Sequence, residues 1–291
     1  MAKSLDQKLA FITGGSEGIG LAVAKQMAQA GANVVIISRN AQKLESALKE
    51  IKKSAPNPAV KISSLAADVS DDAGIQQKLE ALIDQVGVPD YLINCAGFAH
   101  PGYITDLETK TYREMMDVNY FGIVNTCRVL IPHFLRAGKK AHIINTSSVA
   151  GLLSPPSMGV YNVSKHAVVT MSETLYHDLR MVEPRIGVSV LCPAFVPTGI
   201  ADSHRNRPAE LKNDAAPTPS QHLVQAMIKK AVDSGKISAA EVAQMTYDAI
   251  GEERFYIITH PNILPSVSSR MDEIIHQRNP TSPIPKMDKK A

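Results

Sequence analysis

The chain has 291 residues, 44% of them hydrophobic and 20% charged, enough to bury the core of one large α/β domain or two smaller ones. Its 31 Lys and Arg residues against 28 Asp and Glu leave a net charge of only +3, and the basic residues are scattered. A nucleic-acid partner is therefore not expected. The three cysteines, Cys95, Cys127 and Cys192, form no Cys-x-x-Cys pair, which suits a reducing compartment. No signal-peptide pattern and no run of 18 apolar residues is visible, so we expect a cytoplasmic protein without a transmembrane segment.

Short β-branched runs alternate with longer helical patterns along the chain. Runs such as Val34-Val35-Ile36-Ile37 are apolar without alternation, which is typical of parallel strands covered on both faces. The expected strands span residues 8–13, 33–38, 60–66, 90–94, 141–146, 186–192 and 255–259. Strand and helix repeated in this way predict an α/β fold, a doubly wound (Rossmann), mostly parallel seven-stranded sheet with helices on both faces.

Helices are expected where apolar residues recur at three- and four-residue spacing, as in segments 20–29 and 42–53. A late helix is expected to start at Ser238, because Ser238 and Glu241 form a Ser-x-x-Glu capping box, and to stop near Gly251.

Segment 193–220 is rich in Pro, Ala and polar residues and shows little periodicity. A long irregular stretch inside a compact domain predicts a substrate loop or lid, after which a helix resumes at about Gln221. We expect a single dinucleotide-binding and catalytic domain over 1–262, followed by a C-terminal helix and tail over 263–291. The last residues, 281–291, look like a frayed end.

A glycine-rich segment follows the first expected strand and opens the first helix, with the sequence Thr13-Gly14-Gly15-Ser16-Glu17-Gly18-Ile19-Gly20. Glycines permit positive φ and let the backbone approach a pyrophosphate closely. The N-terminus of the following helix offers N–H groups and a positive dipole end to that anion. The segment predicts a dinucleotide site contacted by Gly14, Ser16, Glu17, Gly18, Ile19 and Gly20.

The second expected strand ends at Ser38-Arg39-Asn40. An acidic residue at this point receives the ribose 2′-hydroxyl in NAD-preferring folds, whereas a guanidinium can bind a 2′-phosphate as a charged fork. Arg39 therefore favours NADPH/NADP⁺ over NADH/NAD⁺. The alternative is that Arg39 is only a solvated residue at a strand end.

Tyr161 and Lys165 stand at i and i+4, on one face of an expected helix. A Tyr hydroxyl with its ordinary pKa near 10 is a poor acid or base at neutral pH, and a neighbouring ammonium lowers that pKa. Ser148, thirteen residues upstream, ends the fifth expected strand, where its hydroxyl can polarise a substrate carbonyl. The pair alone is common on exposed helices; Ser148 and the glycine loop favour an active site. Asn119 has two interpretations, a buried structural amide and a member of this constellation.

The glycine spacing Gly-x-x-x-Gly-x-Gly, with Asn119, Ser148, Tyr161 and Lys165 in this order, resembles the classical short-chain dehydrogenase/reductase family over about residues 5–260. The resemblance implies that Tyr161 is the proton donor in reduction and that Ser148 holds the carbonyl. It also implies that Lys165 tunes the pKa of Tyr161 and binds the nicotinamide ribose, and that Asn119 supports a proton relay through water. Hydride passes directly from the nicotinamide, so no metal is expected.

Further cofactor contacts follow from the same resemblance. Asp68 and Val69 correspond to the adenine contacts, and Asn94-Cys95-Ala96-Gly97 is similar to the family's Asn-Asn-Ala-Gly. Pro193-Ala194-Phe195-Val196-Pro197-Thr198 is similar to its Pro-Gly-x-x-x-Thr, which binds the carboxamide. Glu17 departs from the NADPH-preferring pattern, which has a basic residue there. The implied cofactor contacts beyond the glycine loop are Arg39, Asp68, Val69, Asn94, Ala96, Gly97, Tyr161, Lys165, Pro193, Val196 and Thr198.

The expected activity is hydride transfer between NADP(H) and a ketone or secondary alcohol on a bulky apolar substrate. Segment 95–122 resembles 3-ketodihydrosphingosine reductases, which implies a long-chain 3-oxo sphingoid-type ketone. Segment 154–208 resembles bacterial members that act on aryl and other bulky secondary alcohols, which is the alternative. An alternative of another class is a non-catalytic NAD(P)-binding regulator. Family members are usually homodimers or homotetramers. The candidate substrate contacts are His100, Ser148, Leu153, Met158 and Phe195.

Overall fold

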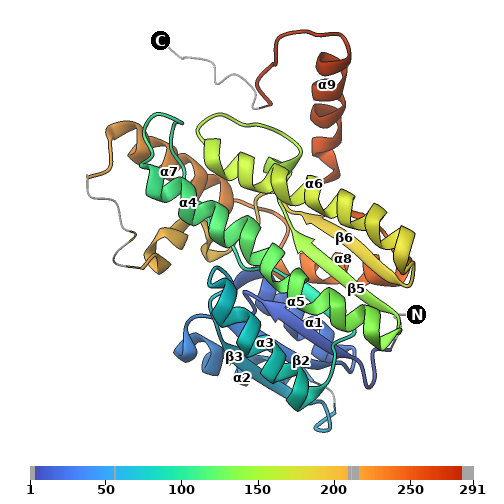
Figure 1. Cartoon of the computed structure of the whole chain (residues 1–291). Coiled ribbons are helices and arrows are strands. Elements are labelled where there is room, and N and C mark those ends of the chain that lie inside the picture. The colour runs from blue at the N-terminus through green and yellow to red at the C-terminus, as the bar shows by residue number, and fades with distance from the viewer. Residues whose placement is uncertain (1–3, 56, 209–210, 212–215, 284–291) are drawn as a thin grey trace.

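The computed structural model describes residues 4–55, 57–208, 211 and 216–283, which are built around a seven-stranded sheet (Figure 1). Neighbouring strands are all parallel, and their order is β3-β2-β1-β4-β5-β6-β7. The strands are β1 (Leu9–Thr13), β2 (Asn33–Ser38), β3 (Ile62–Ala66), β4 (Tyr91–Asn94), β5 (Ala141–Thr146), β6 (Ile186–Cys192) and β7 (Tyr256–Ile258). The predicted doubly wound Rossmann sheet is confirmed.

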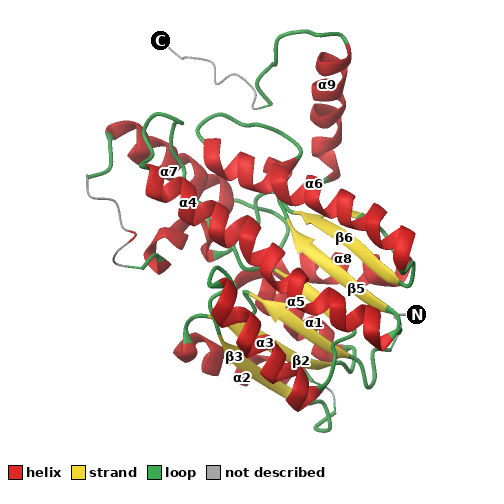
Figure 2. Cartoon of the chain, in the orientation of Figure 1, coloured by secondary structure: helices red, strands yellow, loops and turns green. Residues whose placement is uncertain are grey.

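Three strands, β2, β5 and β6, have the predicted bounds, and the other four are shorter than predicted by one or two residues at one or both ends. Helices cover both faces of the sheet (Figure 2). Because successive side chains on a strand point to opposite faces, Phe11 and Ile12 belong to two separate apolar cores. The Phe11 core is covered by α3 (Asp72–Val86), α5 (Gly122–Ala137) and α6 (Gly159–Val182), and the Ile12 core by α1 (Gly18–Gln29), α2 (Ala41–Ser54) and α8 (Ala239–Glu252).

The sheet reverses its winding between β1 and β4. From β1 the chain moves outward through β2 to β3, then returns to the other side of β1 and continues through β4 to β7. At such a switch point the connecting loops leave in opposite directions and open a crevice at the carboxyl ends of the strands. The predicted site residues that follow strands therefore meet at one edge of the sheet.

Helix α8 confirms the predicted capping box. The Ser238 hydroxyl accepts from the Glu241 N–H at 3.2 Å, and the Glu241 carboxylate accepts from the Ser238 N–H at 2.7 Å. The helix continues to Glu252, one residue beyond the predicted Gly251. Helix α7 (Pro219–Asp233) starts two residues before the predicted Gln221.

The sequence predicted an irregular segment over residues 193–220, but part of this segment is helical. It contains a 3₁₀ helix, η3 (Gly199–Asn206), kinked at Asp202, and ends within the first turn of α7. A 3₁₀ helix has three residues per turn, so its sequence does not show the apolar spacing that identifies an α-helix. Residues 209–210 and 212–215 of this segment lie outside the described residues.

The C-terminal helix, α9 (Leu264–Ile275), follows η5 (Pro261–Ile263) and projects away from the sheet (Figure 1). The predicted frayed tail is described only through Pro283, and the rest lies outside the described residues. Two shorter elements, α4 (Thr109–Met116) and the π-helical turn η1 (Asp117–Phe121), lead into α5. Across the described ranges, no helix combines the length and apolar character that crossing a membrane requires.

A buried polar chain links β5, β6 and the residues before β7. The Ser189 hydroxyl donates to the Arg254 carbonyl at 2.6 Å and stands 2.7 Å from His142 Nε2, so the imidazole is the donor in the second contact. His142 is 3% exposed, and burial lowers its pKa to about 4.

The three cysteines are free thiols, and Cys95 also lines a cavity. Cys127 and Cys192 are buried and Cys95 is partly buried. Burial raises the pKa of Cys95 to about 11 and the pKa of Cys127 and of Cys192 to about 12, so each is a neutral thiol at physiological pH.

Candidate active site

A cavity of about 630 Å³ lies at the carboxyl ends of the central strands, at the switch point of the sheet. Its volume falls within the range of small-molecule and cofactor pockets, about 300–1,000 Å³. Its wall joins the loop after β1, the ends of β2 and β3, the loop after β4, the residues that follow β5, the start of α6 and the segment after β6. Loops that carry the predicted cofactor and catalytic residues therefore share one cavity.

The glycine loop has the backbone that a close-lying ligand needs. Gly14 and Gly18 have φ of +65° and +56°. A Cβ at Gly14 would lie 2.7 Å from the Ala96 nitrogen, and one at Gly20 would lie 2.3 Å from the Gly14 oxygen. Glu17, the N-cap of α1, makes no capping bond with its side chain. An anion bound at this helix terminus would supply the missing acceptor.

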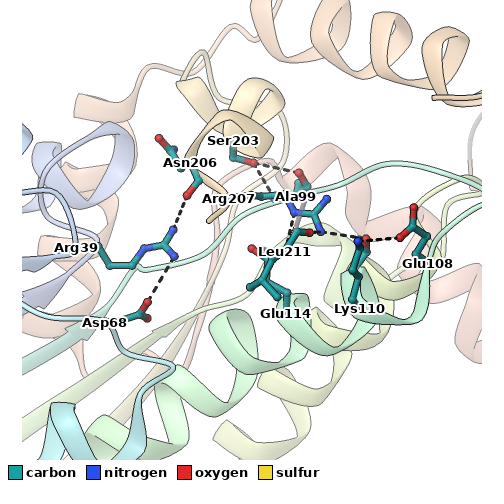
Figure 3. Close-up of polar contacts among 11 residues, drawn as sticks. Arg39, Asp68, Ala99, Glu108, Lys110, Glu114, Ser203, Asn206, Arg207 and Leu211 are labelled. Carbon is teal, nitrogen blue, oxygen red and sulfur yellow. Dashed lines mark hydrogen bonds and ion pairs between the residues drawn. The ribbon is translucent and has the colours of Figure 1, made fainter. Parts of the chain in front are cut away.

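Two cations and two carboxylates meet where β2 ends (Figure 3 shows the Arg39 contacts). Arg39 lies 3.5 Å from the Asp68 carboxylate and donates to the Asn206 carbonyl at 3.1 Å. Lys43 lies 2.8 Å from the Glu17 carboxylate and donates to the Asn206 side-chain oxygen at 3.1 Å. The four charged side chains are between 31% and 47% exposed, so they remain accessible from the solvent side. Their formal charges cancel.

Residues 199–208, here called the strap, form one part of the cavity wall. The strap contributes Gly199, Ile200, Ser203, Asn206 and Pro208 to the cavity wall. The buried Ser203 hydroxyl accepts from the Ala99 N–H at 3.0 Å and donates to the Ala99 carbonyl at 3.1 Å (Figure 3). This reciprocal pair fixes the strap to the loop after β4.

A buried ion pair fixes the other end of the strap. Arg207 Nε donates to the Glu114 carboxylate of α4 at 2.7 Å, and both side chains are 4% exposed (Figure 3). The guanidinium also donates to Thr111 Oγ1 at 3.2 Å and to the Leu211 carbonyl. Burial raises the pKa of Glu114, and the hydrogen bond from Arg207 opposes that rise. Removing the charge of either Arg207 or Glu114 would leave the charge of the other buried without a counter-charge.

Tyr161 and Lys165 lie one turn apart on α6, and both line the cavity. Lys165 Nζ donates to the Thr146 carbonyl at 3.0 Å and stands 5.6 Å from the centroid of the Tyr161 ring. Burial lowers the pKa of Lys165 to about 8. Burial also raises the pKa of Tyr161, and a hydrogen bond with Ser148 acts in the opposite direction. Lowering of the Tyr161 pKa by Lys165 stays a prediction.

Ser148 follows β5 and lies on the cavity wall beside Tyr161. Its hydroxyl donates to the Pro193 carbonyl at 3.2 Å and accepts from the Ala150 N–H at 3.2 Å. Gly151 lets this turn approach α6, because a Cβ there would lie 2.6 Å from the Lys165 oxygen. Ser148 is therefore held at the cavity by backbone contacts on both sides.

Asn119 is fully buried in the π-helical turn η1 and does not belong to the cavity wall, so its contacts are those of a structural amide. Its amide nitrogen donates to the Phe98 carbonyl at 3.0 Å and to the Ser164 hydroxyl at 3.1 Å, and its oxygen accepts from the Phe98 N–H at 2.9 Å. The amide thus ties the loop after β4 to α6 next to Tyr161. A π turn inserts one extra residue and turns the amide out of the helix register. Its role in a proton relay stays a prediction.

Most predicted cofactor contacts meet at the cavity. Its wall includes Gly14, Ser16, Glu17, Gly18, Ile19, Gly20, Arg39, Asp68, Val69, Ala96, Gly97, Tyr161, Lys165, Pro193, Val196 and Thr198. Asn94 does not belong to the wall; it is buried and donates to Asn145 Oδ1 at 3.0 Å. This hydrogen bond joins the carboxyl ends of β4 and β5.

Of the five predicted substrate contacts, Ser148 lies on the cavity wall, and His100, Leu153, Met158 and Phe195 do not. Phe195 is 48% exposed and Leu153 is 8% exposed. The roles of these four residues remain predictions. The wall also includes Val118 from η1, which was not predicted as a substrate contact. Ile200, Ser203 and Asn206, also on the wall, belong to the predicted substrate loop 193–220.

Lys43 is a missed member of the site. It lies four residues after Arg39, in the first turn of α2, whose N-cap Asn40 directly follows Arg39, and both cations line the cavity. That spacing is the signal by which it could have been found.

The residues present fit a nicotinamide dinucleotide. The glycine cradle leaves no room for a Cβ at Gly14 or Gly20, and the start of α1 lacks a side-chain cap from Glu17. Cations lie at one end of the cavity, and Ser148, Tyr161 and Lys165 at the other. Within the described part of the chain, no three His, Cys, Asp or Glu side chains form a group suited to a metal ion.

Comparisons with known proteins agree with this geometry. The sequence pattern of the family described as short chain dehydrogenase matches residues 8–209. A dehydrogenase/reductase of CLA biosynthesis from Lactiplantibacillus plantarum is 30% identical over 276 residues, 94% of this chain and 95% of that protein. An NADP-dependent (R)-specific alcohol dehydrogenase from Lentilactobacillus kefiri is 31% identical over 223 residues, 77% of this chain and 86% of that one.

Among solved structures, a short-chain dehydrogenase/reductase from Burkholderia phymatum in complex with NAD superimposes with a TM-score of 0.92 at 43% identity. The match covers 97% of this chain and 99% of that one. Fold, cavity, sequence pattern and full-length relatives lead to one conclusion. The chain belongs to the short-chain dehydrogenase/reductase family, and it is an NAD(P)-binding oxidoreductase that acts on alcohols or ketones.

Proposed function

We propose that the chain transfers hydride between NADP(H) and a ketone or secondary alcohol carried on a bulky apolar small molecule. The observation that carries this proposal is the convergence of Ser148, Tyr161 and Lys165 on the cavity that also holds the glycine loop. Each of the three has a different chemical task, and each is held in place by a hydrogen bond within the protein.

In the reductive direction, Ser148 donates a hydrogen bond to the carbonyl oxygen and orients the ketone. Tyr161 then delivers its hydroxyl proton to that oxygen, so that negative charge does not accumulate there. Lys165 provides a positive charge behind the Tyr161 ring that stabilises the phenolate left after proton transfer. NADPH, when bound along the glycine loop, would supply the hydride for the carbonyl carbon. Asn119 keeps the loop after β4 and α6 in register for these steps.

An apolar substrate is supported by the wall of the cavity near Tyr161. Phe98 and Val118, which pack in one apolar cluster with Tyr161, contribute to it, and Ile200 adds to the apolar lining of the cavity. We propose a long-chain ketone, such as a 3-oxo sphingoid-type base, as the first candidate. Aryl and other bulky secondary alcohols are the second candidate, which the similarity to an alcohol dehydrogenase favours.

The preference for NADP(H) is supported by Arg39 and Lys43, which both reach the end of the cavity next to β2. Two cations can share the charge of a 2′-phosphate. NAD(H) is the second candidate, since Asp68 and Glu17 already neutralise these cations and the structure at 43% identity contains NAD.

We further propose a cytoplasmic homodimer or homotetramer. Phe121 and Val163 are 46% and 59% exposed on the outer sides of η1 and α6, where a second copy would cover them. Light scattering on the purified chain tests this. A mass of one chain at micromolar concentration would contradict it.

Activity is tested by mixing purified protein with NADPH or NADH and a panel of long-chain, aryl and aliphatic ketones, while nicotinamide absorbance is followed. We expect turnover of apolar ketones. If the cofactor binds and no ketone or alcohol of a broad panel reacts in either direction, the protein is instead a non-catalytic NAD(P)-binding regulator.

The cofactor preference is tested with Arg39→Ala. We expect the KM for NADPH to rise about tenfold or more, with that for NADH changed less than twofold, because only the former has a 2′-phosphate. The matched control is Arg128→Ala, an exposed arginine paired with Asp72 away from the cavity. Equal effects of Arg39→Ala on both cofactors would contradict the assignment.

A further inference from the structure

Asn206 occupies an unusual position on the wall of the cavity. Two of its oxygen atoms face the two cations at the end of β2: the backbone carbonyl accepts from Arg39 at 3.1 Å, and the side-chain oxygen accepts from Lys43 at 3.1 Å (Figure 3 shows the Arg39 contact). Asn206 lies 167 positions from Arg39 in the sequence. The strap therefore reaches the end of the cavity opposite to Tyr161 and supplies hydrogen-bond acceptors there.

The two Asn206 oxygen atoms are acceptors of the kind that a phosphate offers. A 2′-phosphate binds through oxygen atoms that accept from guanidinium and ammonium groups. A 2′-hydroxyl makes no comparable demand, since it is neutral and satisfied by one carboxylate or carbonyl. A phosphate bound beside Arg39 and Lys43 would therefore compete with Asn206 for donor hydrogens of these two side chains.

We propose that Asn206 is a specificity-determining residue of the cofactor site, whose two oxygen atoms compete with the 2′-phosphate of NADP(H) for Arg39 and Lys43. The inference rests on the proposed function, in which the adenosine ribose lies beside Arg39. Asn206 lowers the affinity for NADP(H) and leaves the affinity for NAD(H) unchanged.

The anchors on either side of Asn206 make this competition effective. Arg207, the next residue, is held in a buried ion pair with Glu114, and Ser203 is bound to Ala99 by two hydrogen bonds. Asn206 is thus already positioned near the cations, so that less conformational entropy is lost when its oxygen atoms accept from Arg39 and Lys43. A phosphate that takes over Arg39 and Lys43 has to release the strap at Asn206 while Ser203 and Arg207 stay in place.

The test uses ligands that contain only the adenosine end of the cofactor, so that it does not depend on turnover. Binding of adenosine 2′,5′-bisphosphate and of 5′-AMP to the purified full chain is measured by calorimetry. Asn206→Asp adds a negative charge and is expected to weaken the bisphosphate about tenfold while changing 5′-AMP less than twofold. Asn206→Ala removes the acceptor of Lys43 and is expected to strengthen the bisphosphate about threefold.

Lys229→Gln is the matched control, because Lys229 pairs with Asp202 on the outer side of the same strap, at 3.1 Å. It should change the binding of neither ligand. Equal changes for both ligands in the Asn206 variants, or no change in either, would overturn the proposal. Arg39→Ala separates the two levels of inference: if it weakens both ligands alike, the NADP(H) assignment fails, whereas a selective loss with unresponsive Asn206 variants refutes only the role of Asn206.

Hydrogen exchange of the unmodified protein gives a second measurement that needs no variant. Peptides from 199–208 should exchange faster with saturating adenosine 2′,5′-bisphosphate than with saturating 5′-AMP, because the phosphate releases the Asn206 end. Slower exchange with the bisphosphate would show that the phosphate holds the strap closed, and it would overturn the proposal.

Discussion

The two ends of the cavity are built on opposite principles. At the Tyr161 end the polar side chains are buried, and Lys165, Ser148 and Asn119 each have hydrogen bonds to backbone or side-chain groups that fix them. At the Arg39 end the charged side chains are more than 30% exposed and pair with one another. The reacting end is pre-organised, whereas the binding end can exchange partners.

The difference follows from the task of each end. Proton and hydride transfer need donor and acceptor atoms held within a fraction of an ångström, which buried backbone contacts provide. Recognition of the adenosine ribose needs only a balance of charge, and screened, half-exposed ion pairs each contribute about 0–1 kcal/mol. Chemistry should therefore be sensitive to single atoms at one end, and specificity adjustable in small steps at the other.

The strongest test of this contrast is removal of the Tyr161 hydroxyl. Tyr161→Phe should lower kcat by about 10³-fold or more, because the proton donor is lost, and leave the Kd for NADPH within twofold. The control is Tyr176→Phe on the same helix, whose hydroxyl accepts from Arg180. A loss of cofactor affinity as large as the loss of kcat would show that the two ends are not separate.

The second test concerns the anchor of the strap. Glu114→Gln should lower the free energy of unfolding by about 3–5 kcal/mol, because it leaves the Arg207 guanidinium buried without its counter-charge. Denaturant titration measures the change. Lys140→Gln, which removes an ion pair with Glu253 between side chains 63% and 58% exposed, should cost no more than about 1 kcal/mol. Equal costs would contradict the distinction between buried and exposed pairs.

A third test moves to the amino end of the sheet, remote from both ends of the cavity. The pKa of His142 is about 4 in the folded chain against 6.5 ordinarily, so the unfolded chain binds more protons between these values. The free energy of unfolding should fall as pH drops from 6.5 to 4, by about 3 kcal/mol in all. The slope attributable to His142 should vanish in His142→Gln and persist in His222→Gln, a change at an exposed helix position. An unchanged slope in His142→Gln would assign acid sensitivity to other groups.

The smallest effect is expected at the start of α8, which packs on α1 behind the glycine loop. Ser238→Ala should cost about 1 kcal/mol of unfolding free energy, because it removes the acceptor of the Glu241 N–H. Thermal unfolding measures it, with Ser46→Ala, an exposed serine inside α2, as the control. Cofactor affinity should not change; a change would mean that the glycine loop depends on this cap.

The sheet could be predicted closely because its strands are short, apolar runs between turn residues. Bounds were most accurate for β2, β5 and β6, and least accurate for β3 and β7, which lie at the edges of the sheet. Edge strands pair on one side only, so their ends depend on a single neighbour. The π turn around Asn119 carries no local signal, since it follows from packing of the loop after β4 against α6.

The site was predictable where motifs fix a residue relative to a strand end, as with the glycine loop, Ser148 and Tyr161. It was not predictable where a side chain's direction depends on distant packing. Leu153 and Phe195 follow strand ends along the chain, yet neither belongs to the cavity wall. Asn206 lies between two contacts that are distant in the sequence, Ser203 with Ala99 and Arg207 with Glu114, 104 and 93 residues apart. No local pattern encodes such a contact.

The raised pKa values of the three native thiols have a practical consequence. Thiol-reactive dyes attack thiolates, and pKa values of about 11 to 12 leave almost none of Cys95, Cys127 or Cys192 in that form at pH 7. A cysteine introduced on the surface would therefore carry a label almost alone, with the wild-type thiols left in place. A fluorescent label on Lys230→Cys, on the exposed side of α7, would report movement of α7 near the strap, with the rest of the sequence unchanged.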